Sequence, residues 1–503
     1  MTSSNDSSSR SERTSRRGSS TLRLSTALLI VGFASGIGYA ASPGVTQVTL
    51  LSTSTANDRV QQFYLTFNRI DLLSQSGRTV PLISKPLYAE FMHVNGSAEV
   101  LATARIPQDL YIGISVSVGY SEFTCNMLDS TGGLHSSTFA NGHVPASHVT
   151  VVFRSPILAG SSSLLLYFTL DVSKSARYPS SIQSSENFSI HPTLEVTAAE
   201  LSQKPATFFD GMLLAQEGMV SALDNGDRGF HVTAADGPNC PAKLQASCAD
   251  PARGPRWHVV VDEHTAIQGL KGISALLPGM AVDIDAKIQP DGSLLATRIG
   301  VYDANPAHLS VSWGLLGSIA ASEPVLAAFE TEALGFLDHL SGFPYFSFGR
   351  AEFKVSGQFT HLRDLPFPAA FTASNMVPGQ SVFITSHAMK ILDPPIYEPA
   401  RIVTLMPQVL NGRILSMGRS GGFDTYTIQL ASYNLFPALA HQPGQTTLLK
   451  TPGRVVVYVG DSTEMLKSES LHIGSVFRFG GLVFNDRGTL RMDCSQILDG
   501  VKE

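Results

Sequence analysis

Charged side chains are scarce in this chain of 503 residues: Asp, Glu, Lys and Arg make up 15% of it, against about a quarter of an ordinary globular chain. No basic run follows Arg23, and beyond residue 41 the chain carries 30 Lys and Arg against 39 Asp and Glu. The aromatic-dense stretch Phe343–Phe348 has one neighbouring cation, Arg350; we interpret it as core or edge strand. Nucleic-acid binding needs clustered cations with stacking aromatics, so we expect no nucleic-acid partner.

Long runs of Ala, Glu, Lys and Leu are also missing, whereas the chain has 43 Gly and 28 Pro. This balance favours strands and turns over helices. Hydrophobic residues make up 43% of the chain, enough for packed cores, and the length predicts three or four domains.

The sequence matches one catalytic motif only superficially. A G-x-S-x-G match occurs at Gly418–Gly422, but it lies between two predicted strands and not at the strand-to-helix turn of a nucleophile elbow. The glycine-rich stretch Gly418–Gly422 lacks the Lys-Ser/Thr ending of a phosphate-binding loop, and we interpret it as a hairpin turn between two strands.

Paired carboxylates occur at Asp283 and Asp285, with Asp291 on the following turn. Such groups can bind a cation or act as acid and base. Because Val282 and Ile284 alternate with them, we interpret the two aspartates as the solvent face of an edge strand.

His258 and His264 lie close together in sequence, but no third ligand follows at a zinc-site spacing. We interpret them as two surface histidines beside a turn. The sequence therefore predicts no catalytic residue, no metal ligand and no cofactor, and we expect that the protein is not an enzyme.

The four cysteines form no C-x-x-C pair. Cys240 and Cys248 flank a short loop and are predicted to close a local disulfide, as in proteins of oxidising compartments. Cys125 and Cys494 lie far apart in sequence, and we favour two separate buried thiols over a bridge between them.

The N-terminal segment, residues 1–41, has the pattern of a secretory signal. Five arginines precede a short apolar stretch that begins at Leu24. Small residues follow at Gly38, Ala40 and Ala41. We expect cleavage after Ala40 or Ala41; an uncleaved signal anchor is the alternative, and it would be the chain's only membrane contact. The protein is therefore expected to be exported, to the periplasm, the cell surface or the medium.

Residues 45–199 show short alternating strands. Phe63, Leu65 and Phe67 share one face, and Ser76-Gly77 indicates a turn. Further strands are expected at Ile112–Tyr120, Val149–Phe153, Ser163–Val172 and Phe188–Val196. This pattern predicts a β-sandwich.

The same region resembles the exported β-sandwich family called domain of unknown function 4382. The resemblance rests on Tyr64–Leu72, Asn95-Gly96, Ile106-Pro107, Leu164–Ser175 and His191-Pro192. It implies a fold and an exported location, and no chemistry. This sequence has Ser54–Asp58 where the family often has an Asp-Ala-Pro turn.

The remaining chain contains three units that share ordered markers. Each unit opens on a Gly-x-hydrophobic strand, continues with a hydrophobic strand running into a Thr, and then has a Gly turn before another strand. The opening markers are Gly218-Met-Val, Gly317-Ser-Ile and Gly412-Arg-Ile. The second markers begin at Val259, Phe353 and Val455. The turns are Pro278-Gly279, Pro378-Gly379 and Ile473-Gly474. Two units add hairpin turns, Asp291–Ser293 and Asp486–Gly488. In the second unit, Ser322–Leu340 has helical spacing and predicts a short helix on the barrel.

The markers resemble the exported β-barrel family called domain of unknown function 5666, best over Gly218–Val301. Each unit has about five or six expected strands, enough to close a small barrel of OB-like size. We therefore predict an all-β fold, an N-terminal β-sandwich followed by three small OB-like β-barrel repeats. The predicted boundaries are 45–199 for the sandwich and 208–303, 310–405 and 408–499 for the repeats.

Two functions remain open. The first is a bacterial-type cell-envelope protein, a non-enzymatic array of binding or structural modules whose partner is an envelope polysaccharide or another envelope protein. The alternative is a hydrolase of envelope polymers with a site assembled between domains, which would require carboxylates to converge across an interface.

Overall fold

The computed structural model describes residues 44–128, 134–140, 148–177, 189–224, 228–234, 254–304, 309–319, 325–328, 332–334, 345–357, 362–387, 398–440 and 449–502. Contacts join residues 44–503 into one unit. The expected signal segment, residues 1–41, and the predicted disulfide pair Cys240 and Cys248 lie outside the described residues.

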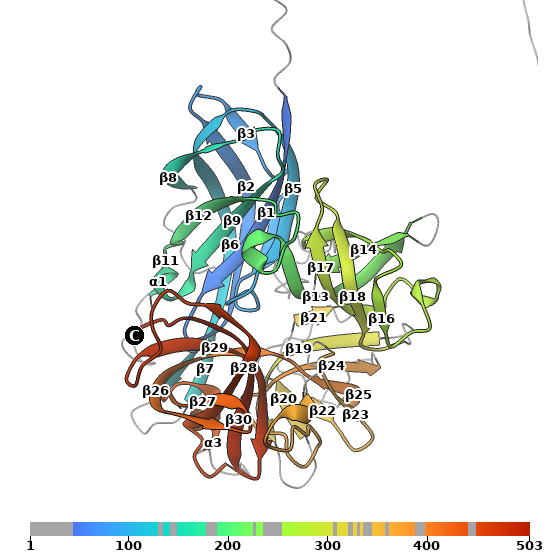
Figure 1. The fold of residues 1–503 in the computed structure, drawn as a ribbon, viewed down its shortest axis with the longest axis vertical. Coiled ribbons are helices and arrows are strands. Elements are labelled where there is room, and N and C mark those ends of the chain that lie inside the picture. The colour runs from blue at the N-terminus through green and yellow to red at the C-terminus, as the bar shows by residue number, and fades with distance from the viewer. Residues whose placement is uncertain are drawn as a thin grey trace, which may run out of the picture. The chain divides into compact units, whose positions relative to one another are not determined.

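Two sheets cover residues 45–200 and form the predicted sandwich (Figure 1). The first has the order β12–β9–β1–β5, with β1 parallel to β9; the second has the order β3–β2–β6–β7, with β4 on β2 and β8 on β6. Their strands are β1 (Val45–Thr55), β2 (Val60–Ser74), β3 (Thr79–Pro81), β4 (Leu87–Glu90), β5 (Glu99–Pro107), β6 (Leu110–Leu128), β7 (Leu134–Ala140), β8 (His148–Leu158), β9 (Leu164–Asp171) and β12 (Leu194–Glu200).

The facing sides of these sheets share one apolar core, in which Phe63, Phe67 and Phe168 are fully buried. Cys125 lies in it as a free thiol, and Cys494 is a second free, buried thiol in the third repeat. The interpretation of two separate thiols is therefore confirmed. A short helix, α1 (Val172–Ser175), and the pair β10 (Ala176–Arg177) and β11 (Ser189–Ile190) connect β9 to β12.

Three five-stranded rings follow, and they share one strand order. In chain order, the pairings of each ring join its first strand to the second, the second to the third, the third to the fifth, the fifth to the fourth and the fourth back to the first. The third ring is a closed barrel. In each ring the third and fifth strands are parallel. This Greek-key order is that of an OB-like barrel, so the predicted fold class is confirmed.

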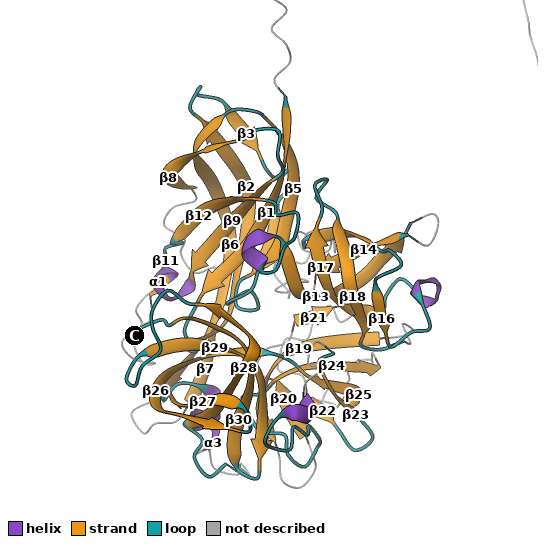
Figure 2. Cartoon of the chain, in the orientation of Figure 1, coloured by secondary structure: helices purple, strands orange, loops and turns teal. Residues whose placement is uncertain are grey.

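The first ring contains β13 (Met212–Leu223), β14 (Gly229–Ala234), β15 (Arg256–Val260), β17 (Ala281–Ile288) and β18 (Leu294–Val301), with β16 (Ala266–Gln268) on β18. The second contains β19 (Leu309–Ile319), β20 (Val325–Ala328), β22 (Tyr345–Ser347), β24 (Ser381–His387) and β25 (Glu398–Leu405), with β21 (Glu332–Leu334) on β19 and β23 (Glu352–Val355) on β25. The third contains β26 (Gln408–Ser420), β27 (Phe423–Leu430), β28 (Arg454–Leu466), β29 (Val476–Asp486) and β30 (Thr489–Asp499). In the described part of the chain, the helical elements besides α1 are α3 (Leu435–Ala440) and 3-10 turns at Phe208–Asp210, Ile273–Ala275 and Leu362–Asp364 (Figure 2).

A repeated hydrogen-bond pair fixes the register of each ring. In the first ring, the Gly279 N–H donates to the Val220 carbonyl (2.7 Å), and the Val220 N–H donates to the Met280 carbonyl (2.9 Å). The same reciprocal pair joins Leu316 to the turn at Gly379, and Ile414 to the turn at Gly474. All three turn glycines have positive φ (88°, 95° and 90°), which explains why the turn marker recurs.

The register shows that one predicted repeat marker was wrong. In each ring a glycine lies two positions before the residue that forms the reciprocal hydrogen bonds, and this glycine pairs with the fourth strand. The three pairs are Gly218 with Val282, Gly314 with Val382 and Gly412 with Phe477. The opening glycine of the second unit is therefore Gly314 and not Gly317. A methyl group added at Gly218 would lie 2.4 Å from the Thr233 carbonyl oxygen; glycine permits this approach where the first strand passes from one neighbour to the other.

The second unit corrects two further predictions. Within the predicted helix Ser322–Leu340, the described residues form strands β20 and β21, which pair with β19. Ring closure needs a second strand here, and its hydrogen bonds override the local helical spacing. The marker at Phe353 lies on β23, beside β25, whereas the third strand of this ring is β22.

The repeats share apolar cores with their neighbours. Leu51, Val100 and Tyr167 of the sandwich pack with the core of the first ring. Tyr302 stacks on Phe383 (4.0 Å between ring centroids) and connects the first ring to the second. Tyr458, Leu482 and Phe484 of the third ring join the core of the second. Among the described residues, no helix has the length and apolar character that crossing a membrane requires.

Trp257 connects the first ring to the sandwich, and its replacement tests this junction. The buried indole N–H donates to the Val100 carbonyl (2.9 Å). Trp257→Phe is expected to lower the free energy of unfolding by about 1–3 kcal/mol, because the bond is lost and a buried carbonyl loses a donor. Urea unfolding followed by circular dichroism measures the change.

Arg256→Ala is the matched control, since Arg256 is the exposed neighbour on the same strand. Its effect is expected to stay within about 0.5 kcal/mol. Equal losses in both variants would contradict the proposed role of the indole.

Candidate functional site

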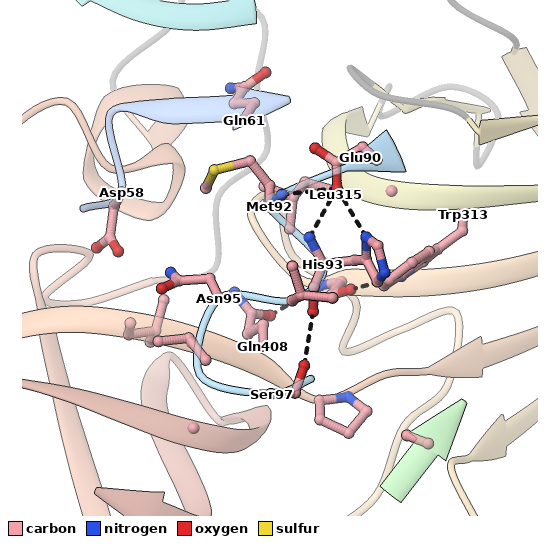
Figure 3. Close-up of a pocket in the computed structure, with 18 of the residues that line it drawn as sticks. Asp58, Gln61, Glu90, Met92, His93, Asn95, Ser97, Trp313, Leu315 and Gln408 are labelled. Atoms are coloured by element: carbon pink, nitrogen blue, oxygen red, sulfur yellow. Dashed lines mark hydrogen bonds and ion pairs between the residues drawn. The ribbon is translucent and has the colours of Figure 1, made fainter. Parts of the chain in front are cut away.

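A cavity of about 280 Å³ lies where the sandwich and all three rings meet. Its walls include Met92 and Glu99 of the sandwich, Gln216 of the first ring, Trp313 of the second and Gln408 of the third. Figure 3 shows His93, Asn95, Trp313 and Gln408 lying around this space. Residues far apart in sequence form this pocket, and no single repeat could supply it.

The end of β4 and the turn after it supply a hydrogen-bonded cluster of Glu90 and His93. Both Glu90 carboxylate oxygens accept hydrogen bonds: Oε1 from the Phe63 N–H (2.9 Å), and Oε2 from the backbone N–H groups of Met92 and His93 (2.8 Å each). The His93 ring lies between two carboxylates, with Nδ1 3.0 Å from Glu90 Oε2 and Nε2 3.1 Å from Glu99 Oε2. The ring is thereby fixed, edge-on to Trp313 (5.6 Å between centroids).

Hydrogen bonds hold the walls together across the units. Gln216 donates to the Ala98 carbonyl (3.0 Å), and Gln408 donates to the Gly379 carbonyl (3.0 Å) while it accepts from the Ser381 N–H (2.8 Å). Asp58 of the sandwich accepts from the Asn411 N–H of the third ring (2.9 Å). The pocket is therefore held by polar contacts from every side.

A buried Arg also joins the sandwich to the third ring. The Arg478 guanidinium donates to the Asp499 carbonyl (2.9 Å) and to the Asn95 side-chain oxygen. Burial lowers the pKa of Arg478 to about 10, so the side chain still carries its charge at neutral pH.

Glu217 is the unusual acid of the pocket. It is 6% exposed, and Oε1 accepts from the Tyr302 hydroxyl (3.3 Å), whereas Oε2 has no hydrogen-bond partner among the described residues. Burial, and next the neighbouring Asp283 carboxylate, raise the pKa of Glu217 to about 8. The side chain therefore holds its proton near neutral pH. Glu99 Oε1 is another buried oxygen to which no residue in the described part of the chain hydrogen-bonds.

Asp283 and Asp285 differ from their sequence interpretation. Their strand, β17, lies between β13 and β18 and is not an edge strand. The two residues are buried (2% and 9% exposed), and the side chain of each accepts from Arg298 at 2.6 Å. A methyl group at Gly300 would lie 1.9 Å from Asp283 Oδ1, so glycine provides the space for this carboxylate. The alternation with Val282 does not reveal burial, because both faces of this strand are covered.

The other sequence candidates lie outside the pocket. Asp291 is exposed and closes a hairpin turn by accepting from the Ser293 N–H (2.9 Å). His258 and His264 are exposed, as interpreted. Gly421 and Gly422 form the two-residue turn between β26 and β27, with φ of 58° and 91°, so the hairpin is confirmed. In the aromatic run, Phe346 and Phe348 belong to the core of the second ring.

Sequence reasoning missed the pocket residues Glu90, His93, Glu99, Glu217 and Trp313. None lies in a motif of fixed spacing. The sequence offers one signal for this site, because Glu217 immediately precedes the Gly218 marker. In the structure, Glu217 pairs with Asp283 on the neighbouring strand.

Glu217→Gln tests the raised pKa through stability. Below about pH 4.5, the ordinary pKa, the carboxyl is protonated whether the chain is folded or not. Between about 4.5 and 8 the unfolded chain loses the proton and the folded chain keeps it, so stability falls as pH rises; above about 8 the cost is constant. Glutamine has nearly the same shape as glutamic acid and can still form hydrogen bonds, but it does not ionise. The variant therefore removes the free-energy cost of keeping the carboxyl protonated in the folded chain. We expect it to exceed the wild type by at least about 1 kcal/mol at pH 8.5, with the difference vanishing near pH 4.5.

Urea unfolding across this pH range measures the difference. Glu200→Gln, on an exposed position of β12, is the control and should show no such trend. A pH-independent difference for Glu217→Gln would contradict the raised pKa.

The comparisons with known proteins cover the first ring. Residues 217–300 match the family described as a domain of unknown function (DUF5666), and the resemblance seen over Gly218–Val301 is confirmed. No curated protein and no solved structure matches the chain. The matched range includes Glu217, Asp283 and Arg298, so the buried acidic network lies within the segment that is similar to this family.

Proposed function

We propose that this protein is a non-enzymatic, exported binding protein of the bacterial-type cell envelope, and that the central pocket holds a sugar unit of an envelope polysaccharide. The lining of the pocket carries the proposal. It contains eight side-chain amides and the carboxyl groups of Asp58, Glu90, Glu99 and Glu217, and none of the described residues that line it is Lys or Arg. Such a pocket disfavours anions.

The chemistry of the lining matches hydroxyl groups. Side-chain amides both donate and accept hydrogen bonds, and carboxylates accept them, as a ligand rich in hydroxyls requires. Trp313 adds an aromatic surface, partly covered by His93, against which the C–H groups of a sugar can pack. At about 280 Å³, the cavity is close to the lower limit of ligand pockets, which favours one sugar unit or a chain end over a long polymer.

The exported location is supported by the signal pattern of residues 1–41 and by the resemblance of residues 45–199 to the family called domain of unknown function 4382. The membrane contact of such a protein is its N-terminal segment, if that segment is not cleaved. Another envelope protein is the alternative partner, for which the exposed hairpin turn at Gly421–Gly422 would be a contact point.

A hydrolase is the second candidate, and one observation favours it. Glu99 of the sandwich and Glu217 of the first ring line the same pocket, and Glu217 keeps its proton near neutral pH. A protonated acid beside a second carboxylate is the pairing used in glycoside hydrolysis. Both acids are almost fully buried, which favours binding over turnover.

Fluorescence of Trp313 tests the binding proposal. The chain has two tryptophans, so in Trp257→Phe the indole at the pocket is the only one. We expect saturable emission changes on titration with neutral or amino-sugar mono- and disaccharides. Met92→Arg, which places a long cation at the half-buried pocket wall, should abolish the response.

Met465→Arg is the matched control, since Met465 is 50% exposed and does not line the cavity. An unchanged response in the Met92 variant, or no response to any sugar, would exclude sugar binding at this pocket. Mass spectrometry of the sugars after incubation separates the two functions: intact sugars support binding, and cleaved sugars establish the hydrolase.

Processing of the N-terminus tests export. Mass spectrometry of the native protein, with membrane and soluble fractions separated, is expected to find a chain that begins at Ala41 or Ser42. An intact N-terminus in the membrane fraction would establish the anchor, and an intact N-terminus in the cytoplasmic fraction would exclude export.

A further inference from the structure

Three potential metal ligands meet at one end of the first ring, in a cluster separate from the central pocket. His231 on β14 and His258 on β15 are direct partners across the two strands. Their rings stack with centroids 5.0 Å apart and 26° between planes. Asp224, immediately after β13, joins them from the third strand of this sheet.

Both imidazoles are directed at the same carboxylate. His258 Nε2 lies 2.9 Å from Asp224 Oδ2, and His231 Nε2 lies 3.4 Å from Asp224 Oδ1. One ligand atom from each residue lies within 4.8 Å of the other two. Ligand atoms around a tetrahedral Zn²⁺ are about 3.3 Å apart, given metal–ligand bonds of about 2.0–2.1 Å. A small rotation of partly exposed side chains is enough to close the cluster on an ion.

Gly229 provides the space that this arrangement needs. A methyl group there would lie 2.4 Å from Asp224 Oδ2 and 3.2 Å from His258 Nε2. Any larger residue at this position would push the carboxylate away from the histidine. The Asp224 N–H donates to the Gly229 carbonyl (3.1 Å), which fixes the backbone of the acid beside the glycine.

We propose that Asp224, His231 and His258 bind a divalent transition-metal ion such as Zn²⁺. Two imidazoles and a carboxylate are ligands of this class of ion. The side chains of His231, His258 and Asp224 are 48%, 42% and 31% exposed, so the ion can enter from solvent and keep water in its remaining positions. The sequence spacing concealed this site, because strand pairing brings together residues that are 7 and 27 positions apart.

Titration of the full chain with ZnCl₂ against a chromophoric chelator tests the site. We expect saturable binding of one ion by the wild type. His231→Ala, His258→Ala and Asp224→Asn should each weaken binding at least about tenfold, and Gly229→Ala should also weaken it. The visible spectrum with Co²⁺ gives a second readout of imidazole ligation and should be lost in the two histidine variants.

His264→Ala is the matched control, because His264 is exposed, lies in the same ring and is outside the cluster. Its zinc affinity should equal that of the wild type. The chain has 14 histidines, so zinc binding that survives in both His231→Ala and His258→Ala would overturn the proposal, as would a wild type with no saturable binding. Circular dichroism confirms that each variant is folded.

Discussion

Closure of each five-stranded ring depends on one strand that must pair with both of its neighbours. The first strand does this by passing from the fourth strand to the second within a few residues, and the glycines Gly218, Gly314 and Gly412 lie at that passage. The reciprocal hydrogen bonds to a left-handed glycine turn then set the register. Since a one-residue slip would turn every side chain to the opposite face, the apolar core of each ring follows from this constraint.

Closed rings must still bury part of their outer surface, because each packs against a neighbour. Apolar contacts cover some of it, as at Tyr302 and Phe383. The polar groups buried at these contacts need hydrogen-bond partners, since burying a polar group without one raises the free energy of the folded state. Glu90 takes backbone donors on both oxygens, and Arg298 donates to both Asp283 and Asp285. These hydrogen-bonded groups stabilise the structure around the cavity.

Around the cavity, a few oxygens have no protein partner among the described residues. Glu99 Oε1, Gln216 Oε1 and Glu217 Oε2 are buried and unbonded within the described structure, and all three residues line the cavity. A bound polar ligand would satisfy them at little further cost, since their desolvation has already occurred on folding. The buried acids thus connect the packing of the rings to the proposed binding function.

The sequence by itself determined the β architecture, the repeat order and the hairpin turns, because these depend on local periodicity and on glycine conformation. Glycines such as Gly279 and Gly422 indicate turns in the sequence, because they adopt the positive φ that these turns require. Tertiary structure alone decided which polar residues are buried or gathered. Asp283 follows an ordinary alternating pattern, and its burial depends on the neighbouring strands; Glu217 and Glu99, or His231 and His258, meet only after distant strands have paired. The physical reason is that periodicity reports the two faces of a strand, whereas burial and convergence depend on what packs against each face.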